Sequence, residues 1–225
     1  MRFYNDRYIK GSRAVDMSKN LKEMSVRGRP KKFDRDNVLE KAMNLFWRFG
    51  YEPTSMSELI AGTGVKPSSL YAEFGSKEGL FCAAVEKYLA TYGQARDAIL
   101  DQDELPLQQV IEQLLRTSVE WFTDAEMPPG CFMVAATFGM SAADDVLFHQ
   151  LSQQRNSAER KVIECLACRV DKGELPDNTN CALLGKYIVN VIQGMSVQAR
   201  NGATYDELSG LVDIFMRQWP AIAAT

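Results

Sequence analysis

The sequence predicts an all-α protein, with an N-terminal three-helix helix-turn-helix domain and a larger helical domain after it. Apolar residues recur at spacings of three and four from Asp34 onward, which is typical of amphipathic helices. Gly and Pro residues divide this pattern into segments of helical length, and no segment of the 225 residues alternates as a strand does. We therefore expect a basic arm at 1–32, the helix-turn-helix domain at 33–80 and the larger domain at 81–225.

Residues 1–32 are polar, rich in Lys and Arg, and without a sustained hydrophobic period, which predicts a flexible arm. Met17 and Met24 lie inside it, so the translation start is open among these two residues and Met1. The arm lacks the apolar core of a signal peptide. No apolar run approaches the roughly 18–20 residues that span a bilayer, so we expect a cytoplasmic protein.

The helix-turn-helix domain is predicted from caps and glycines. Its first helix starts at Asp34, a good N-cap, and ends at Gly50. Ser55 followed by Glu58 is the pattern of a capping box, which opens a short second helix that ends at residues 62–64. Pro67 suits the first turn of a third helix, because the N–H that proline lacks would have no helical partner there.

The remaining helices are longer. A fourth helix opens at Ser76 and extends to about Tyr92. Gly and Pro residues separate the segments that follow, and the residues 128–130, Pro-Pro-Gly, make the sharpest break. The apolar spacing predicts helices at about 106–124, 131–140, 144–172, 179–201 and 204–218.

Two short helices joined by a glycine-bearing turn define a helix-turn-helix, whose second helix enters the major groove of DNA. That helix is expected at residues 66–74. Leu70 and Phe74 lie four positions apart and would face the domain core. The residues left to contact bases or phosphates are Lys66, Pro67, Ser68, Ser69 and Tyr71.

The run GVKPSSLYAEFGSKE at residues 64–78, in register with a first helix that ends in Phe-Gly-Tyr, resembles the TetR family of bacterial repressors. The resemblance extends over residues 33–89. Ala72 and Glu73 depart from the family pattern, in which His-Tyr is common. Carried over position by position, the resemblance implies DNA contacts from Thr54 and Ser55 at the second helix, Ser68, Ser69 and Tyr71 in the recognition helix, and Lys77 at the start of the fourth.

The arm contributes a second candidate DNA element. Its residues 27–32, RGRPKK, resemble the core of an AT-hook, in which an extended Arg-Gly-Arg fits the narrow minor groove of A·T-rich DNA. The arms of homeodomains stand in the same position before a helix-turn-helix. We expect Arg27, Arg29 and Lys31 to contact DNA.

Charge and composition support this reading. Residues 1–80 contain 15 of the 26 Lys and Arg residues but 10 of the 29 Asp and Glu residues, which leaves 11 and 19 for residues 81–225. Such asymmetry indicates an N-terminal part that meets a polyanion. A single His and no phosphate loop, nucleophile elbow or metal-ligand spacing argue against an enzyme, a metal site or a cofactor.

For the larger domain, the resemblance implies a small-molecule effector and a homodimer formed by the last two long helices. Such a dimer sets two recognition helices one DNA turn apart, roughly 34–36 Å. Large apolar or singly polar residues are the candidates for the effector pocket. They are Trp121, Phe122, Cys131, Phe132, Phe138, Met140 and His149.

The sequence therefore predicts a DNA-binding repressor that is released by a small molecule. An alternative is a thiol-based redox or electrophile sensor that uses Cys131, placed after the Pro-Pro-Gly break, or the pair Cys165 and Cys168. The five cysteines, an odd number at irregular spacing, do not suggest a disulfide framework.

Overall fold

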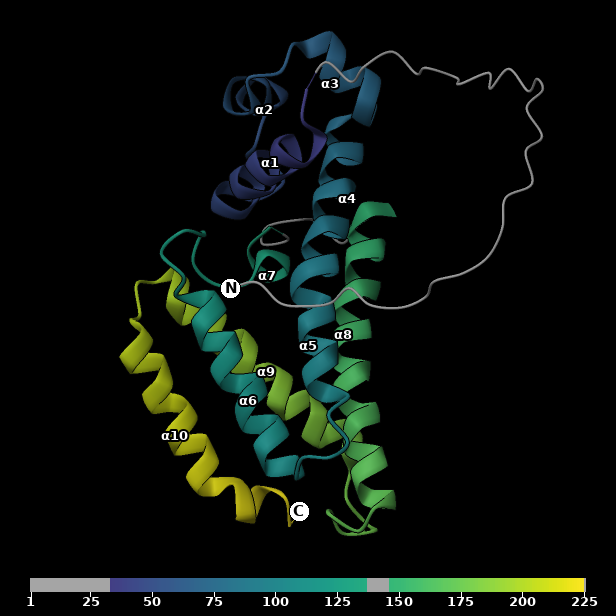
Figure 1. The fold of residues 1–225 in the computed structure, drawn as a ribbon, viewed down its shortest axis with the longest axis vertical. Helices are drawn as coiled ribbons and strands as arrows, with labels where there is room; N and C mark the ends of the chain where they lie inside the picture. The colour runs from purple at the N-terminus through teal and green to yellow at the C-terminus, as the bar shows by residue number, and fades with distance from the viewer. Residues whose placement is uncertain (1–32, 137–145, 225) are drawn as a thin grey trace, which may run out of the picture. The chain divides into compact units, whose positions relative to one another are not determined.

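A computed structural model describes residues 33–136 and 146–224 of the chain, and within these ranges it is helical without strands, as the sequence predicts. Figure 1 shows α1, α2 and α3 together at one end, with α4 leading away toward the other helices. The elements are α1 (Arg35–Phe49), α2 (Met56–Thr63), α3 (Pro67–Phe74), α4 (Lys77–Tyr88), η1 (Leu89–Gly93), α5 (Gln94–Leu100), α6 (Leu107–Phe122), α7 (Phe132–Ala136), α8 (Val146–Asp171), α9 (Cys181–Arg200) and α10 (Tyr205–Ile222).

The first helices begin and end as predicted because their caps form. Asp34 Oδ1 accepts hydrogen bonds from two backbone N–H groups in the first turn of α1. At α2, Ser55 Oγ accepts from the Glu58 N–H while the Glu58 carboxylate accepts from the Ser55 N–H, a complete capping box. Gly64 ends α2 with a φ of 71°, in the left-handed region that favours glycine.

A continuous helical rod carries the chain from α4 through η1 into α5, which corrects the prediction of a helix end near Tyr92. Gly93 does not end the rod, because it is buried and adopts an ordinary helical φ of −64°. The element η1 is a π-helical turn, and such turns are frequent at functional sites. Ile99 and Leu100 pack in the interior, and this tertiary packing outweighs the weak helix propensity of glycine.

The last helix also runs further than predicted. α10 continues to Ile222, past Pro220, whereas the sequence suggested an end near residue 218. Trp219 is buried, and its carbonyl oxygen accepts a hydrogen bond from the Ala223 N–H at 2.8 Å. The buried indole thus fixes the final turn, and the proline is tolerated near the helix end.

Two clusters of buried side chains form the core. The first joins α1, α4 and α7 through aromatic rings, and it includes an edge-to-face contact of Trp47 with Tyr88, with ring centroids 5.4 Å apart. The second joins α5, α6, α8, α9 and α10 mainly through aliphatic residues, together with Phe122, Phe215 and Trp219. Cys131, before α7, packs against both clusters and so lies where they meet.

A buried arginine holds the connection between α5 and α6. Arg169, in the last turn of α8, is 1% exposed and donates to the carbonyl oxygens of Gln102 at 2.8 Å and Leu105 at 2.7 Å. Its guanidinium also pairs with Glu174 at 2.6 Å, and Glu174 accepts from the Leu107 N–H that begins α6. Burial alone raises the pKa of the Glu174 carboxyl, but these two donors outweigh burial and bring the pKa below its usual 4.5.

The described residues form one compact unit, and α4 runs through the expected domain boundary near residue 80 without a break. The division at that position therefore stays a prediction. In the described part of the chain, no helix combines the length and the apolar character that crossing a membrane requires.

Candidate DNA-binding surface and ligand cavity

The short helix α3 shows an outward polar face. Lys66, Pro67 and Ser68 are exposed, Ser69 is half-buried, and the Tyr71 side chain is 46% exposed. Leu70 is 1% exposed and anchors the helix to the core. The residues that the sequence assigned to DNA therefore lie together on one accessible helix, with small side chains at its N-terminal end.

An ion pair neutralises the acidic residue on this helix. Arg35 Nε donates to Glu73 Oε1 at 2.9 Å, and the Arg35 guanidinium lies 5.4 Å from the centre of the Phe74 ring. Glu73 departs from the family pattern and would otherwise repel a phosphate. Its pairing with α1 reduces that repulsion and ties α3 to α1.

The residues predicted to contact DNA from the second helix and from the start of the fourth differ in exposure and in contacts. Ser55 is exposed at the N-terminus of α2. The prediction that Thr54 contacts DNA is wrong. Its side chain is 1% exposed and its hydroxyl donates to the Gly50 carbonyl at 2.7 Å, so it stabilises the turn between α1 and α2. Lys77 is half-buried, and its Nζ donates to the Glu52 carbonyl at 3.2 Å and lies 4.3 Å from the centre of the Tyr51 ring.

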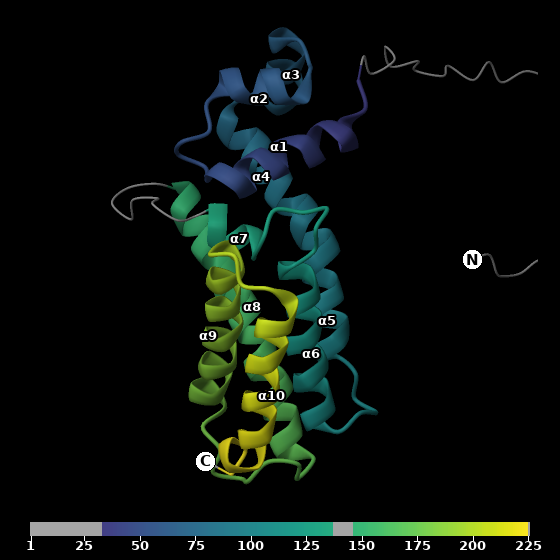
Figure 2. The same ribbon diagram turned by 90° about the vertical axis from the view of Figure 1, so that its left-hand side faces the viewer.

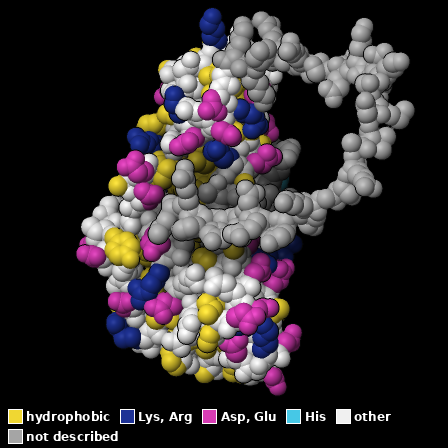
Figure 3. Space-filling model, in the orientation of Figure 1, with side chains coloured by type: hydrophobic (Ala, Val, Ile, Leu, Met, Phe, Trp, Pro, Cys, Tyr) yellow, Lys and Arg dark blue, Asp and Glu magenta, His cyan; other side chains and the backbone are white. Residues whose placement is uncertain are grey.

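The basic charge of the N-terminal part resides in the arm rather than in the helices. Residues 33–80 contain five Lys and Arg against seven Asp and Glu, whereas residues 1–32 contain ten against three. Figure 3 shows basic and acidic side chains mixed on one face of the helices, with a basic side chain at the tip of the α2–α3 end. Arg27, Arg29 and Lys31 lie outside the described residues.

A cavity of about 130 Å³ lies among the rod α4–η1–α5, α6, α7, α8 and α9. One water needs roughly 10–15 Å³ on such a measure, so the cavity is large enough for a small organic molecule. Trp121, Phe122 and Cys131 line it, as predicted, and most of the lining is apolar. Lining residues that the sequence reading missed include Tyr88, Tyr92, Arg96, Arg155 and Ser196.

Several polar groups in the cavity lining, on Tyr88, Ser118, Cys131 and Ser196, are hydrogen-bonded to the protein. The Tyr88 hydroxyl lies 3.3 Å from Cys131 Sγ, and the Cys131 N–H donates to Ser196 Oγ at 2.7 Å. Ser118 donates to the Leu114 carbonyl at 2.7 Å. Burial raises the pKa of the Tyr88 hydroxyl well above its usual value, so it stays protonated.

Two of the predicted pocket residues, Phe132 and His149, are not among the described residues that line the cavity. Phe132 is fully buried in the aromatic cluster, within 6 Å of Trp47, Phe81 and Tyr88 by ring centroids, and packs there instead. His149 is exposed on α8. Phe138 and Met140 lie outside the described residues.

The remaining cysteines do not form a site. Cys165 is buried on α8 and Cys168 is exposed one turn later, and burial raises the pKa of the Cys165 thiol. Within residues 33–136 and 146–224, no group of three or more His, Cys, Asp or Glu residues could hold a metal ion.

Three contacts connect the cavity wall with the helix-turn-helix end. Arg200, in the last turn of α9, donates to the Trp47 carbonyl of α1 at 2.9 Å and approaches the Arg48 carbonyl at 3.5 Å. The Tyr51 N–H donates to the Ala136 carbonyl of α7 at 3.1 Å. Gly130 has a φ of 79°, and a Cβ there would lie 2.6 Å from the Ser196 carbonyl, so the loop before α7 sits directly on α9.

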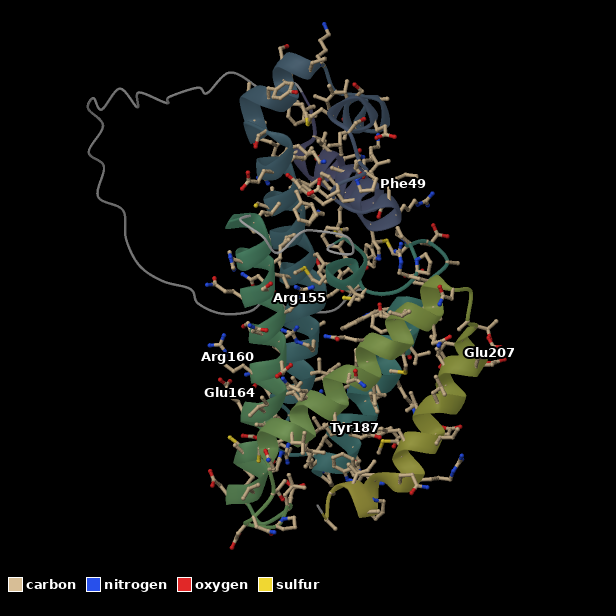
Figure 4. The ribbon with its side chains drawn as sticks, turned by 180° about the vertical axis from the view of Figure 1, so that it is seen from behind. Phe49, Arg155, Arg160, Glu164, Tyr187 and Glu207 are labelled. Atoms are coloured by element: carbon tan, nitrogen blue, oxygen red, sulfur yellow. The ribbon has the colours of Figure 1, made fainter. Side chains whose placement is uncertain are left out.

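The outer faces of α9 and α10 carry exposed apolar side chains. Figure 2 shows these two helices side by side on the face turned to the viewer, and Figure 4 labels Tyr187 on α9. Single exposed apolar residues are ordinary, but this group is concentrated on two neighbouring helices. Its members, 43–66% exposed, are Leu183, Tyr187, Val197, Tyr205, Leu211 and Ile214.

Comparisons with known proteins agree with the motif in α2 and α3. Residues 38–84 match the family model of bacterial regulatory proteins of the tetR family, and residues 106–208 match the tetracyclin repressor-like C-terminal domain. The HTH-type transcriptional repressor ComR of Escherichia coli K12 is 35% identical over 209 residues, which cover 93% of this chain and 99% of ComR. The HTH-type transcriptional regulator YezE of Bacillus subtilis is 28% identical over 190 residues, which cover 83% and 96%.

A solved structure extends the likeness to the fold. The TetR family transcriptional regulator CifR, as a cysteine mutant in complex with 26-bp operator DNA, superposes with a TM-score of 0.79 at 35% identity, over 85% of this chain and 100% of the CifR chain. These relatives are named as regulators of transcription rather than enzymes, and the comparisons do not favour the thiol-sensor alternative. The chain belongs to the TetR family of bacterial transcriptional regulators.

Proposed function

We propose that this chain is a homodimeric repressor that binds operator DNA with α3 of each protomer and leaves the DNA when a small molecule occupies the cavity. The observation that carries the proposal is the exposed polar face of α3, anchored by Leu70. ComR is named as a repressor, and CifR was solved on its operator. Such a protein acts on the bacterial chromosome, in the cytoplasm.

Operator binding combines two elements in this proposal. Ser68 and Ser69 leave room for α3 to approach the base edges closely, while Tyr71 and Ser55 reach phosphates through their hydroxyl groups. The described helices carry no net excess of basic residues. The arm, with Arg27, Arg29 and Lys31, therefore supplies most of the attraction to the DNA backbone.

Dimerisation uses the exposed apolar faces of α9 and α10. Tyr187 stacks on Phe215 of α10 with ring centroids 5.8 Å apart, so the two helices present a joint surface. Covering it with a second copy removes apolar area from water, the main source of stability in obligate dimers. A two-fold dimer of this kind also presents two copies of α3 to one duplex.

Release requires that the cavity acts on the DNA-binding end. Ser196 lines the cavity, and Arg200 contacts α1 one turn further along α9. A ligand that displaces α9 or α7 would change the support of α1 and thereby the spacing of the two α3 helices. The effector then weakens DNA binding by its preference for the displaced state.

The test is fluorescence anisotropy with a labelled duplex from upstream of the gene that encodes the chain. Tyr71→Ala is expected to weaken binding roughly tenfold on every duplex, because it removes a phosphate contact. Lys66→Ala should lower the slope of log affinity against log salt by about one unit. Gln113→Ala, exposed on α6, is the matched control and should bind like the wild type. Unchanged affinity and salt slope in both α3 variants would contradict the proposed docking.

A further inference from the structure

The π-helical turn η1 forms part of the cavity wall. Leu89, Tyr92 and Gly93, three of its five residues, line the cavity. Tyr92 contributes a ring that packs edge-to-face on Trp121, with ring centroids 5.3 Å apart. Gly93 is buried and contributes no side chain. At this position the wall therefore consists of backbone alone.

No contact in the described fold requires a glycine at position 93. Its φ of −64° and ψ of −49° are ordinary helical values that alanine adopts readily. Among the described residues, an added Cβ would meet only the Leu89 side chain, at 3.5 Å, which is an ordinary van der Waals distance. Glycine is less favourable than alanine inside a helix, because it loses more conformational freedom on folding. Alanine would thus fit the backbone and stabilise the rod.

The space beside Gly93 belongs to the cavity. Gly93 is buried and lines the cavity, yet its added Cβ would touch no other described helix. Gly185 of α9 is a buried helical glycine too, but a Cβ there would lie 2.6 Å from Ile163 Cγ1 of α8. Glycine at position 185 thus admits a neighbouring helix, whereas glycine at position 93 leaves room for a ligand.

The cavity has about the size of one aromatic ring. A protein cavity of roughly 150 Å³ lined by Leu, Ile and Phe binds benzene, and the present cavity measures about 130 Å³. Its lining has a similar character, with aliphatic side chains of α6, α8 and α9 and the rings of Tyr88, Tyr92, Trp121 and Phe122. A methyl group added at Gly93 would take a substantial share of this volume.

The polar groups of the lining disfavour a charged ligand. Arg96 is already paired with Asp97, whose carboxylate lies 2.7 Å from the guanidinium, and Arg155 is hydrogen-bonded within α8. A charged ligand would lose its water and would have to compete with these existing partners. Tyr92 and Gln193 add uncharged polar groups to the lining, which suit a hydroxyl group.

We infer that Gly93 sets the size of the effector, and that the cavity admits an uncharged molecule no larger than one substituted aromatic ring. Glycine at this position weakens the helix and gives the ligand the space beside the rod, an exchange of stability for binding. The inference rests on the proposed role of the cavity as the effector site and specifies the size and chemical class of the effector.

The experiment varies the size of the ligand at constant chemistry, on the full-length protein, by isothermal titration calorimetry and thermal shift. Toluene is compared with naphthalene, and 4-methylphenol with 2-naphthol. At least one single-ring compound should bind and raise the melting temperature, and its two-ring counterpart should bind at least roughly tenfold more weakly. Benzoate, a single ring with a charge, should also bind at least roughly tenfold more weakly.

The variant Gly93→Ala should have two effects of opposite sign. It should raise the melting temperature of the free protein by about 2–4 °C, because alanine is the better helix former. It should weaken binding of the single-ring compound at least roughly tenfold, because the methyl group occupies the cavity. Gln94→Ala, which places the same alanine on an exposed position of the rod, is the matched control and should leave the affinity unchanged.

Any of four results would overturn the inference. They are a lower melting temperature in Gly93→Ala, equal affinities of Gly93→Ala and Gln94→Ala, a two-ring compound or benzoate that binds as tightly as the single-ring compound, and no binding by any single-ring compound at millimolar concentration. Binding of duplex DNA by the same preparation separates these outcomes from a failure of the proposed repressor function. A protein that binds DNA but none of these compounds is a repressor with a different effector.

Discussion

The DNA-binding end and the cavity differ in how their residues are distributed along the chain. The candidate DNA contacts of the described helices fall between Ser55 and Lys77, on consecutive short helices. The cavity draws its lining from Tyr88 to Ser196, across α4 to α9. A surface built from adjacent helices leaves a local motif in the sequence, whereas a cavity built from distant helices leaves none. The two regions nevertheless share helices and hydrogen bonds, and the following predictions test how far they are separate.

The largest expected effect is the loss of stability in Arg169→Ala. The variant leaves the carbonyls of Gln102 and Leu105 and the carboxylate of Glu174 without their buried partner. We expect a loss of about 2–3 kcal/mol in the free energy of unfolding, measured by urea denaturation. Because the described residues form one unit, α1–α3 should unfold in the same transition as the cavity helices.

Lys172→Ala is the control, since the Lys172–Asp103 ion pair is exposed and should contribute little. The wild type supplies a second check. The folded state holds the pKa of Glu174 below its usual 4.5, so this group stabilises the protein above that pH, and the stabilisation is lost as the pH falls through the folded pKa. Arg169→Ala should show a smaller loss over the same acid range. Separate transitions for α1–α3 and the cavity helices would show that the two regions are independent.

Removal of residues 1–32 is expected to have the next largest effect, on DNA affinity alone. The arm holds ten Lys and Arg against three Asp and Glu, whereas residues 33–80 carry a slight acidic excess. At about 0.15 M salt the truncated protein should bind DNA at least roughly tenfold more weakly and with a shallower salt dependence. Its melting temperature should match that of the full chain. Equal affinity at low salt would assign the electrostatic attraction to the helices instead.

Arg200→Gln should have the smallest effect and tests the connection between the two regions. The guanidinium caps the C-terminal carbonyls of α1, where a cation also interacts favourably with the helix dipole. We expect DNA affinity to fall roughly threefold, about 0.7 kcal/mol, in the anisotropy assay. Arg217→Gln, exposed on α10, serves as the control. An Arg200→Gln variant that binds DNA like the control would mean that α9 does not support α1.

The contrast between features built from neighbouring residues and features built from distant helices also explains what could be predicted from the sequence. Asp34, Ser55 and Gly64 are recognisable because caps depend on residues within one turn of each other. Tertiary packing decides the other features. Gly93 remains helical and Thr54 turns inward because of what surrounds them, and Arg96 and Arg155 meet at a cavity only after α5 packs against α8. Trp121, Phe122 and Cys131 were found by residue type, a criterion that also selected Phe132, which packs in the core.

The π-helical turn η1 has a consequence for the evolution of the chain. A π turn accommodates one residue more than an α turn, so an insertion or deletion at η1 changes the turn type instead of rotating every later side chain by about 100°. The DNA-binding end, which is attached through α4, therefore keeps its structure when the chain length changes at the cavity. Relatives could therefore acquire new effectors by gaining or losing a residue at Leu89–Gly93 while they keep the same operator.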